Sequence, residues 1–308
     1  MSADPHFQKV ALIGIGLIGS SMAHAMRRKG LAAHIAGYAR RTETLEKAEA
    51  IGFADSLHDN LATCARDADL VVLATPVGTF GTLTQEMAPH LSKGAIISDV
   101  GSVKSAVVRD VGPHVPEGVH LIPAHPIAGT EQSGPEAGFA ELFEGRWCIL
   151  TPPPGADAAA VGKLRAFWEA LGSNVDVMEP RHHDLVLAIT SHVPHLIAYN
   201  IVGTADDLET VTQGEVIKYS AGGFRDFTRI AASDPTMWRD VFLNNREAVL
   251  EILQRFNEDL SALQRAIRWG DGDMLFNLFT RTRAIRRSII DAGQDSAAPN
   301  FGRNPKKK

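Results

Sequence analysis

VALIGIGLIG, residues 10–19, is the stretch of sequence that decides the fold of this chain. Its apolar start, Val10–Ile13, predicts a buried strand, and the residues from Leu17 to Lys29 predict a helix. Between them stands the pattern Gly14-x-Gly16-x-x-Gly19. In such a turn the first glycine permits the tight bend and the second lets a pyrophosphate approach the backbone. The third lets the helix pack closely on the strand.

The glycine turn predicts a dinucleotide site, because the helix that follows offers phosphates its unpaired N–H groups and its positive dipole end. The residues that we expect to hold the cofactor here are Gly14, Gly16, Leu17, Ile18 and Gly19. A tight turn without a ligand is the alternative, since the glycine pattern by itself is weak evidence. Its place inside a predicted strand–turn–helix unit favours the cofactor.

The rest of the first half alternates predicted strands with predicted helices. A second strand is expected at His34–Tyr38, and a helix at Thr42–Ile51 with Gly52 at its end. The later apolar runs predict strands at Leu70–Ala74, Ala95–Asp99, His120–Pro123, Cys148–Leu150 and Asn174–Met178. This alternation predicts right-handed βαβ units and a doubly wound sheet. The fold class is therefore α/β, with an N-terminal Rossmann-type domain over residues 1–178.

The second half shows helical periodicity and almost no strand signal. One long helix is expected over Asp240–Ile267, with apolar residues along one face. The sequence therefore predicts an all-α substrate and dimerisation domain over residues 179–293, followed by a flexible basic tail over 294–308. Long helices with one apolar face often associate in pairs, which favours a homodimer through this domain. The alternative is a helical domain that packs only on its own sheet domain.

Composition excludes several classes of protein. The 308 residues carry a formal net charge of −5, which gives no basic footprint for nucleic acid. The two cysteines, Cys64 and Cys148, do not have metal-ligand spacing, so we expect no metal. The N-terminus shows no secretory signal, and no apolar run is expected to approach the roughly 20 residues that span a bilayer. A cytoplasmic protein without a membrane partner is expected.

The end of the second predicted strand bears on the choice of cofactor. An Asp or Glu there binds the ribose 2′-OH of NAD, but this chain has Ala39, followed by Arg40 and Arg41. An arginine at this place can pair with a 2′-phosphate, which favours NADP over NAD. The alternative is that Arg40 stacks on the adenine and that either cofactor is accepted. Thr75 and Pro76, which end the third strand, complete the expected cofactor site.

Two segments rich in small residues follow predicted strands, at the edge where open α/β sheets bind ligands. They are Ser98–Lys104 and Ala124–Gly134. We expect His125 to stand at the end of a strand and to act as a general base near neutral pH, with Ser102 bonded to the same substrate hydroxyl. The alternatives are a structural histidine that fixes its loop, and a helix N-cap at Ser102 ahead of residues 103–108.

The helical half adds two polar segments, Ser191–His195 and Gly222–Arg229. His192 and His195 share a helical face, but no carboxylate follows at metal-ligand spacing, which argues against a metal. Arg225 and Arg229 would also share a face, and arginine forks suit carboxylates, so a small anionic substrate is expected. A surface salt-bridge face is the alternative.

Together these segments resemble the prephenate/arogenate (cyclohexadienyl) dehydrogenase family, over about residues 9 to 290. The matching stretches are Val10–Ser20, Asp99–Lys104, His125–Gly134, His183-Asp184, Ser191–His195, Gly222–Arg229 and Ser233–Arg239. The resemblance implies oxidative decarboxylation with NAD(P)+ in tyrosine biosynthesis. Prephenate would give 4-hydroxyphenylpyruvate, and arogenate would give tyrosine. The choice between these substrates stays open.

The resemblance also implies roles for single residues. His125 would be the base, Ser102 would hold the reacting hydroxyl and the nicotinamide, and Arg229 would bind the ring carboxylate. The resemblance implies that Ser191, His195, Thr130 and Arg225 contact the substrate side chain and that Glu131 belongs to a gating ionic network. His192, in the same segment as His195, is a further candidate substrate-binding residue. Two alternatives remain: a β-hydroxyacid or imine reductase of the same plan, and a non-catalytic cofactor-sensing Rossmann protein.

Overall fold

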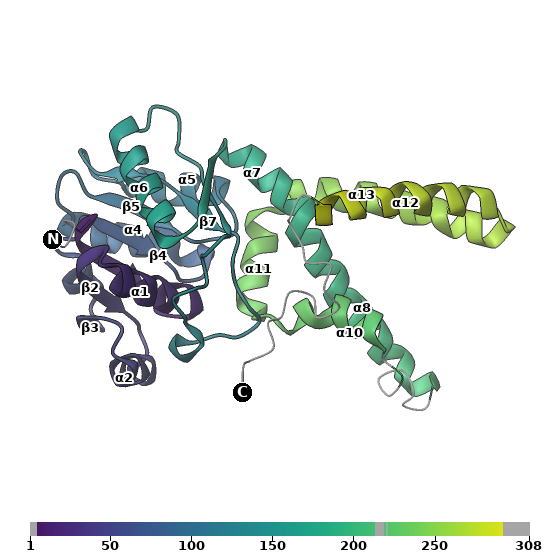
Figure 1. The fold of residues 1–308 in the computed structure, drawn as a ribbon, viewed down its shortest axis with the longest axis horizontal. Helices are drawn as coiled ribbons and strands as arrows, with labels where there is room; N and C mark the ends of the chain where they lie inside the picture. Colours follow the sequence, from purple (N-terminus) through teal and green to yellow (C-terminus); the bar gives the residue numbers. More distant parts are fainter. Residues whose placement is uncertain (1–4, 213–218, 220, 292–308) are drawn as a thin grey trace. The chain divides into compact units, whose positions relative to one another are not determined.

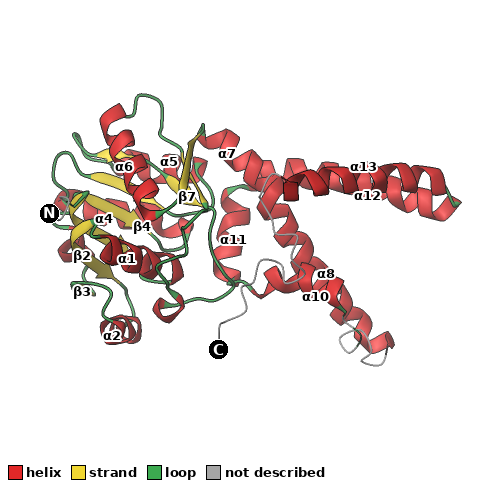
Figure 2. Cartoon of the chain, in the orientation of Figure 1, coloured by secondary structure: helices red, strands yellow, loops and turns green. Residues whose placement is uncertain are grey.

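The computed structural model describes residues 5–212, 219 and 221–291. It divides into two compact units, Met1–Leu250 and Glu251–Lys308, and each is described by itself. The first unit holds all the strands of the described chain together with most of its helices, whereas the described part of the second is helical (Figure 2).

A six-stranded parallel sheet forms the centre of the first unit, in the order β3-β2-β1-β4-β5-β6 (Figure 1). Its strands are β1 (Phe7–Ile13), β2 (Ala32–Tyr38), β3 (Ser56–His58), β4 (Leu70–Leu73), β5 (Ile96–Asp99) and β6 (His120–Leu121). The chain runs outward from β1 to β3 and then returns to β4 on the other side of β1. Open α/β sheets bind ligands at such a reversal, beside the carboxyl ends of the strands. The predicted Rossmann-type sheet is confirmed.

Helices cover both faces of this sheet because successive strand residues point to opposite sides. Val10 and Leu12 belong to one buried cluster, and Ala11 and Ile13 to the other. The helices between the strands are α1 (Leu17–Lys29), α2 (Thr42–Ile51), α3 (Leu61–Ala65), α4 (Phe80–Met87) and α5 (Ser105–Val111). The predicted bounds of the first two are confirmed.

A second, smaller sheet was not expected. It has the order β7-β8-β9, with β7 (Ala124–Pro126), β8 (Trp147–Leu150) and β9 (Asn174–Val177). The chain changes sheets at Pro123, which has no N–H to extend the first ladder: the N–H of Ile122 still bonds to Ile97, whereas the carbonyl of Pro123 accepts from Thr151. His125 therefore lies within β7 and not at the end of a strand of the main sheet, which corrects the expectation.

Short 3-10 turns aside, the remaining elements are helical; those after residue 179 confirm the predicted helical half, whereas the helix over Ala158–Leu171 was not expected. They are α6 (Ala158–Leu171), α7 (Pro180–Leu187), a π-helical turn (Ala188–His192), α8 (Val193–Thr212), α10 (Gly222–Thr228), α11 (Pro235–Asn244), α12 (Arg246–Trp269) and α13 (Gly272–Asp291). The single helix expected over Asp240–Ile267 is wrong, because α11 ends before the buried residue Asn245 and α12 begins after it.

The described part of the second unit contains most of α12 and all of α13, joined by a turn at Gly270 with φ +69°. Large apolar side chains are exposed along both helices, among them Ile267, Trp269 and Phe276. In addition, the helical stretch Pro180–Leu208 is long and apolar enough, by length and composition alone, to cross a membrane. The expectation that no apolar run approaches this length is therefore wrong. The core helix of a soluble protein meets the same criterion, so a single such helix is weak evidence for a membrane span.

Candidate active site

The glycine turn between β1 and α1 has the backbone that a dinucleotide site needs. Gly14 has φ +104°, and a Cβ atom there would stand 2.7 Å from the carbonyl oxygen of Ala74. A Cβ atom on Gly19 would collide with the carbonyl oxygen of Gly14. A Cβ atom on Gly16, by contrast, would meet nothing within 4 Å. The turn thus leaves open space at Gly16, and no side chain caps the N-terminus of α1, so a pyrophosphate fits there.

The second part of the expected cofactor site lies beside this turn. The N–H of Gly14 bonds to the carbonyl of Tyr38 at 3.0 Å, which places the end of β2 next to the glycines. Arg40 and Arg41 follow with exposed side chains, and among the described residues neither has an ion-pair partner. On the other side, the side chain of Thr75 approaches Gly14 and bonds to Thr79 at 2.8 Å between hydroxyl oxygens. Two free arginines and a hydroxyl therefore border the turn.

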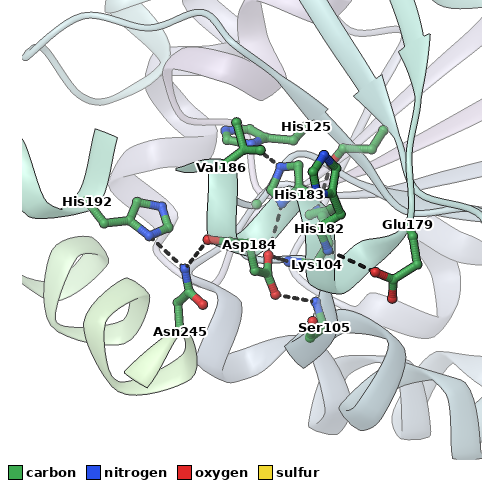
Figure 3. A network of polar contacts seen from close by, with 12 residues as sticks. Lys104, Ser105, His125, Glu179, His182, His183, Asp184, Val186, His192 and Asn245 are labelled. Atoms are coloured by element: carbon green, nitrogen blue, oxygen red, sulfur yellow. Dashed lines mark hydrogen bonds and ion pairs between the residues drawn. The ribbon is translucent and has the colours of Figure 1, made fainter. Parts of the chain in front are cut away.

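His125 is the first member of a buried chain of polar side chains (Figure 3). Its Nδ1 lies 2.9 Å from Nε2 of His183, and Nδ1 of His183 lies 2.9 Å from Oδ1 of Asp184. Asp184 comes from α7, which begins with a Glu179 side-chain cap and Pro180. Burial lowers the pKa of His125 well below its usual range, and the charges of His183 and Lys104 act in the same direction. His125 is therefore neutral near pH 7.

Hydrogen bonds to two carboxylates hold both ends of the segment that carries Ser102: Asp184 at one end and Asp99 at the other. The backbone N–H groups of Lys104 and Ser105 donate to the two oxygens of Asp184, at 2.7 and 2.8 Å. Asp99, where β5 ends, accepts from the N–H groups of Gly101 and Ala124. Because α5 begins at Ser105 with Lys104 at its N-cap, Ser102 is not the N-cap, and that alternative is wrong.

A fully buried ion pair holds these two anchors together. The Lys104 ammonium donates to Asp99 and, at 2.8 Å, to the carbonyl of Ala124, which precedes His125. Burial raises the pKa of Asp99 and lowers the pKa of Lys104, and the attraction between the two charges opposes both shifts. The pair thus fixes β7 against the loop of Ser102. The sequence contained this lysine inside a motif, but nothing in the pattern revealed its role.

The helices supply a second group of side chains. The side-chain nitrogen of Asn245 donates to the carbonyl of Asp184 at 2.8 Å and lies 3.0 Å from Nδ1 of His192 (Figure 3). His195 stacks on Trp238, with 3.7 Å between ring centroids, and its Nδ1 bonds to the carbonyl of Ser191. Burial lowers the pKa of His192 to about 4. The two histidines thus have separate partners.

Two buried nitrogens in this group stand out. Nε1 of Trp238 has no hydrogen-bond partner among the described residues, and Nε2 of His192 has no well-formed one, although the backbone of Ser102 lies close enough to raise the pKa of His192. Buried polar atoms in proteins almost always have a partner, so such atoms point to a ligand or an ordered water. Sequence reasoning found His192 but missed Trp238 and Asn245, since their roles depend on contacts between distant segments.

The predicted anion-binding residues lie on the exposed side. Arg229 pairs with Glu131 at 3.1 Å, and both side chains are more than two-fifths exposed. The charge of Arg229 helps to lower the pKa of His195, after burial, which places the two side chains near each other. Arg225 is exposed one helical turn earlier, on α10. Thr130 accepts a bond from the N–H of Gln132 and is also exposed. Arg229 therefore lies near His195, whereas Arg225 is exposed on the preceding turn.

Two family models match the chain in succession. The nucleotide-binding domain of prephenate dehydrogenase matches residues 22–177, and its dimerization domain matches residues 179–281. Cyclohexadienyl dehydrogenase of Zymomonas mobilis is 40% identical over 283 residues, which are 92% of this chain and 96% of that protein. Prephenate dehydrogenase of Bacillus subtilis is 32% identical over 293 residues, which are 95% of this chain and 78% of that protein.

Solved structures agree with these matches. Prephenate dehydrogenase of Aquifex aeolicus, in complex with hydroxyphenyl propionate and NAD+, has a TM-score of 0.85 and 35% identity, over 92% of this chain and 98% of that one. Arogenate dehydrogenase of Synechocystis has a TM-score of 0.75 and 28% identity, over 91% of this chain and 99% of that one. The chain therefore belongs to the prephenate dehydrogenase family and is an NAD(P)-dependent oxidoreductase of tyrosine biosynthesis.

Proposed function

We propose that His125 is the general base in the oxidative decarboxylation of prephenate or arogenate. The observation that carries this assignment is a buried imidazole whose Nδ1 faces Nε2 of His183 at 2.9 Å, while its own Nε2 bonds to no described residue; burial also holds its pKa well below the usual range. A base must be unprotonated at working pH and must reach the proton that it removes. His125 takes the proton of the ring hydroxyl. The C4 hydride leaves, the ring carboxylate departs as carbon dioxide, and the ring becomes aromatic.

We assign to Ser102 the task of holding the reacting hydroxyl beside His125. Its loop is fixed to the same carboxylates that fix β7, so the two side chains keep their relative positions. The candidate substrate-binding residues are Arg229, Arg225, His195, His192, Ser191, Thr130 and Glu131. Arg229 binds the ring carboxylate, which must not be held too tightly, because it loses its charge on leaving. The unpartnered Nε1 of Trp238, whose ring stacks on His195, supports a polar ligand next to these residues.

The glycine turn is the proposed cofactor site, together with Arg40, Arg41, Thr75 and Pro76. When bound, the nicotinamide accepts the hydride. We propose a preference for NADP, because Ala39 replaces the acidic residue that binds a ribose 2′-OH and because both exposed arginines lack an ion-pair partner among the described residues. The Aquifex relative was solved with NAD+, so the ratio of kcat/KM for NADP+ and NAD+ in this chain is the measurement that tests the preference.

We propose further that the chain works as a cytoplasmic homodimer, with residues 1–178 as the cofactor domain and 179–293 as the helical domain. The dimerization-domain match supports this arrangement. The many large apolar side chains exposed along the helical part support it too, since exposed apolar surface of this kind often marks an interface. Each of them would be covered by a second copy. Sedimentation equilibrium tests the assembly, and a monomer at micromolar concentration would contradict it.

Steady-state kinetics with four combinations tests the reaction: prephenate and arogenate, each with NAD+ and NADP+. We expect turnover of at least one substrate, with carbon dioxide released in step with the reduced cofactor. The more efficient combination identifies the substrate and the cofactor together. Absence of turnover in all four combinations, with a folded protein, would refute the proposed reaction.

A further inference from the structure

The buried chain that begins at His125 continues to His183 and Asp184, and neither residue belongs to the proposed substrate or cofactor sites. Resting on the assignment of His125 as the base, we propose that His183 and Asp184 are positioning residues that fix the proton arrangement of His125 and stabilise its protonated form. The unit would thus be a relay of two imidazoles and one carboxylate.

The directions of the hydrogen bonds follow from one charge. Burial alone would raise the pKa of Asp184, but the bonds from His183, Lys104 and Ser105 outweigh it, and the net pKa is lowered. Asp184 is therefore a carboxylate and can only accept, so Nδ1 of His183 donates to it. Near neutral pH, where burial keeps the pKa of His183 low, its Nε2 then carries a lone pair.

The same reasoning applies to the next bond. Nε2 of His183 accepts at 2.9 Å, so Nδ1 of His125 must carry the hydrogen and donate. In a neutral imidazole this leaves the lone pair on Nε2 of His125. That nitrogen is the one without a partner among the described residues, and it is free to take a proton from a substrate. With the opposite arrangement Nε2 would carry a hydrogen and could not act as a base.

The chain also stabilises the charge that the reaction creates. When Nε2 of His125 takes the hydroxyl proton, the ring becomes an imidazolium among groups that oppose a positive charge. The groups that face it are Lys104, His183 and His192, with Asp99 paired to Lys104. The carboxylate of Asp184, linked through His183, is the negative charge that offsets this repulsion. The relay itself takes up only the hydroxyl proton of the substrate, and the hydride goes to the nicotinamide.

Asp184 is held firmly enough to act in this way. Its two oxygens accept from Lys104 and Ser105, at the start of α5, and its backbone carbonyl accepts from Asn245. A purely structural reading is that the residue only joins α7 to α5. The two readings differ in what they predict for the pH dependence of turnover, because a structural contact does not change the basicity of His125.

His183→Asn tests the relay, with His182→Asn as the matched control. His182 is the neighbouring residue on the same helix, is exposed, and bonds to Glu179 only through its backbone N–H. We expect His183→Asn to lower kcat by about 10²-fold, within the usual contribution of positioned acid–base groups, and to change KM little. We also expect the acidic limb of the kcat profile to move to lower pH, because His125 loses its link to Asp184. His182→Asn should match the wild type.

Two further variants complete the test. His183→Gln places an amide oxygen near the lost Nε2, so it should recover part of kcat by restoring the bond from His125, while the acidic limb stays displaced. It also replaces His183→Asn if that protein does not fold, as judged by circular dichroism and cofactor binding. His125→Asn separates the two claims. If it is inactive but His183→Asn keeps the wild-type kcat and pH profile, the relay is wrong and the base stands. If His125→Asn is active, the base itself is wrong.

Discussion

The buried network around His125 and the exposed ion pair of Glu131 and Arg229 belong to the same unit of the molecule but are built in opposite ways. Every oxygen of Asp99 and Asp184 in the network accepts at least one bond, and the Lys104–Asp99 pair is fully buried. The Glu131–Arg229 pair has a single contact and open access to water. Breaking a buried pair costs several kcal/mol, whereas exposed pairs contribute little.

This difference separates two tasks. Proton transfer requires groups that stay within a fraction of an ångström of their working positions, and the network provides that rigidity. Recognition of an anionic substrate that must enter and leave requires groups that exchange partners, and Arg229 can release Glu131 at small cost. Variants that disturb the network should therefore affect folding or kcat, and variants that disturb the pair should affect KM.

Lys104→Met should have the largest effect, because it leaves the carboxylate of Asp99 buried without its cation. We expect a loss of about 3–5 kcal/mol in the free energy of unfolding, measured by urea denaturation. Lys47→Met is the control: it removes exposed ion pairs to Glu43 and Glu136 and should leave the midpoint nearly unchanged. Equal midpoints for the two variants would contradict the contrast between buried and exposed pairs.

His125→Asn should lower kcat by about 10²-fold or more while substrate binding is largely kept, because the asparagine cannot accept the hydroxyl proton. Stopped-flow and steady-state kinetics under saturating cofactor measure both quantities. Turnover close to that of the wild type would remove His125 from the role of base.

Arg229→Ala should mainly raise KM, by about tenfold or more, since a charge-assisted hydrogen bond to the substrate carboxylate is lost. Glu131→Gln breaks the same ion pair but keeps the arginine, so its KM should change much less. An unchanged KM in Arg229→Ala would exclude the carboxylate contact, and equal effects in both variants would assign the role to the pair.

Ala39→Asp should have the smallest effect, a shift of cofactor preference toward NAD+, because the new carboxylate can accept from a ribose 2′-OH and repels a 2′-phosphate. The ratio of kcat/KM for NADP+ and NAD+ measures it. If the wild-type enzyme already uses NAD+ far better than NADP+, the interpretation of Arg40 is wrong.

The sequence predicted most where the signals are local. Helix α1 begins directly after the glycine turn and ends at Gly30, and α2 ends at Gly52. These two terminal glycines have φ +66° and +76°. Small residues around polar groups after β5 and β6 also pointed to Ser102 and His125, although the strand that carries His125 belongs to the second sheet. Such features depend on a few neighbouring residues and can be read from the chain directly.

The sequence predicted least where a side chain is decided by a distant partner. The helix break at Asn245 depends on its bonds to Asp184 and His192, which stand 61 and 53 positions earlier in the chain. No local pattern interrupts the apolar periodicity there. The small sheet depends on the pairing of β7 with β8, across an intervening loop. His183 and Asp184 appeared in a matching stretch without a role, because their importance arises only when α7 meets α5.

The open space at Gly16 has a consequence for how this turn would change over generations. Gly14 and Gly19 are required by the fold, because a larger side chain at either would strike the backbone. Gly16 has no such constraint within the protein, and only a bound pyrophosphate would exclude a side chain there. In a descendant that no longer bound a cofactor, residue 16 would therefore be the first of the three glycines to be substituted, while Gly14 and Gly19 would be retained because the fold requires them.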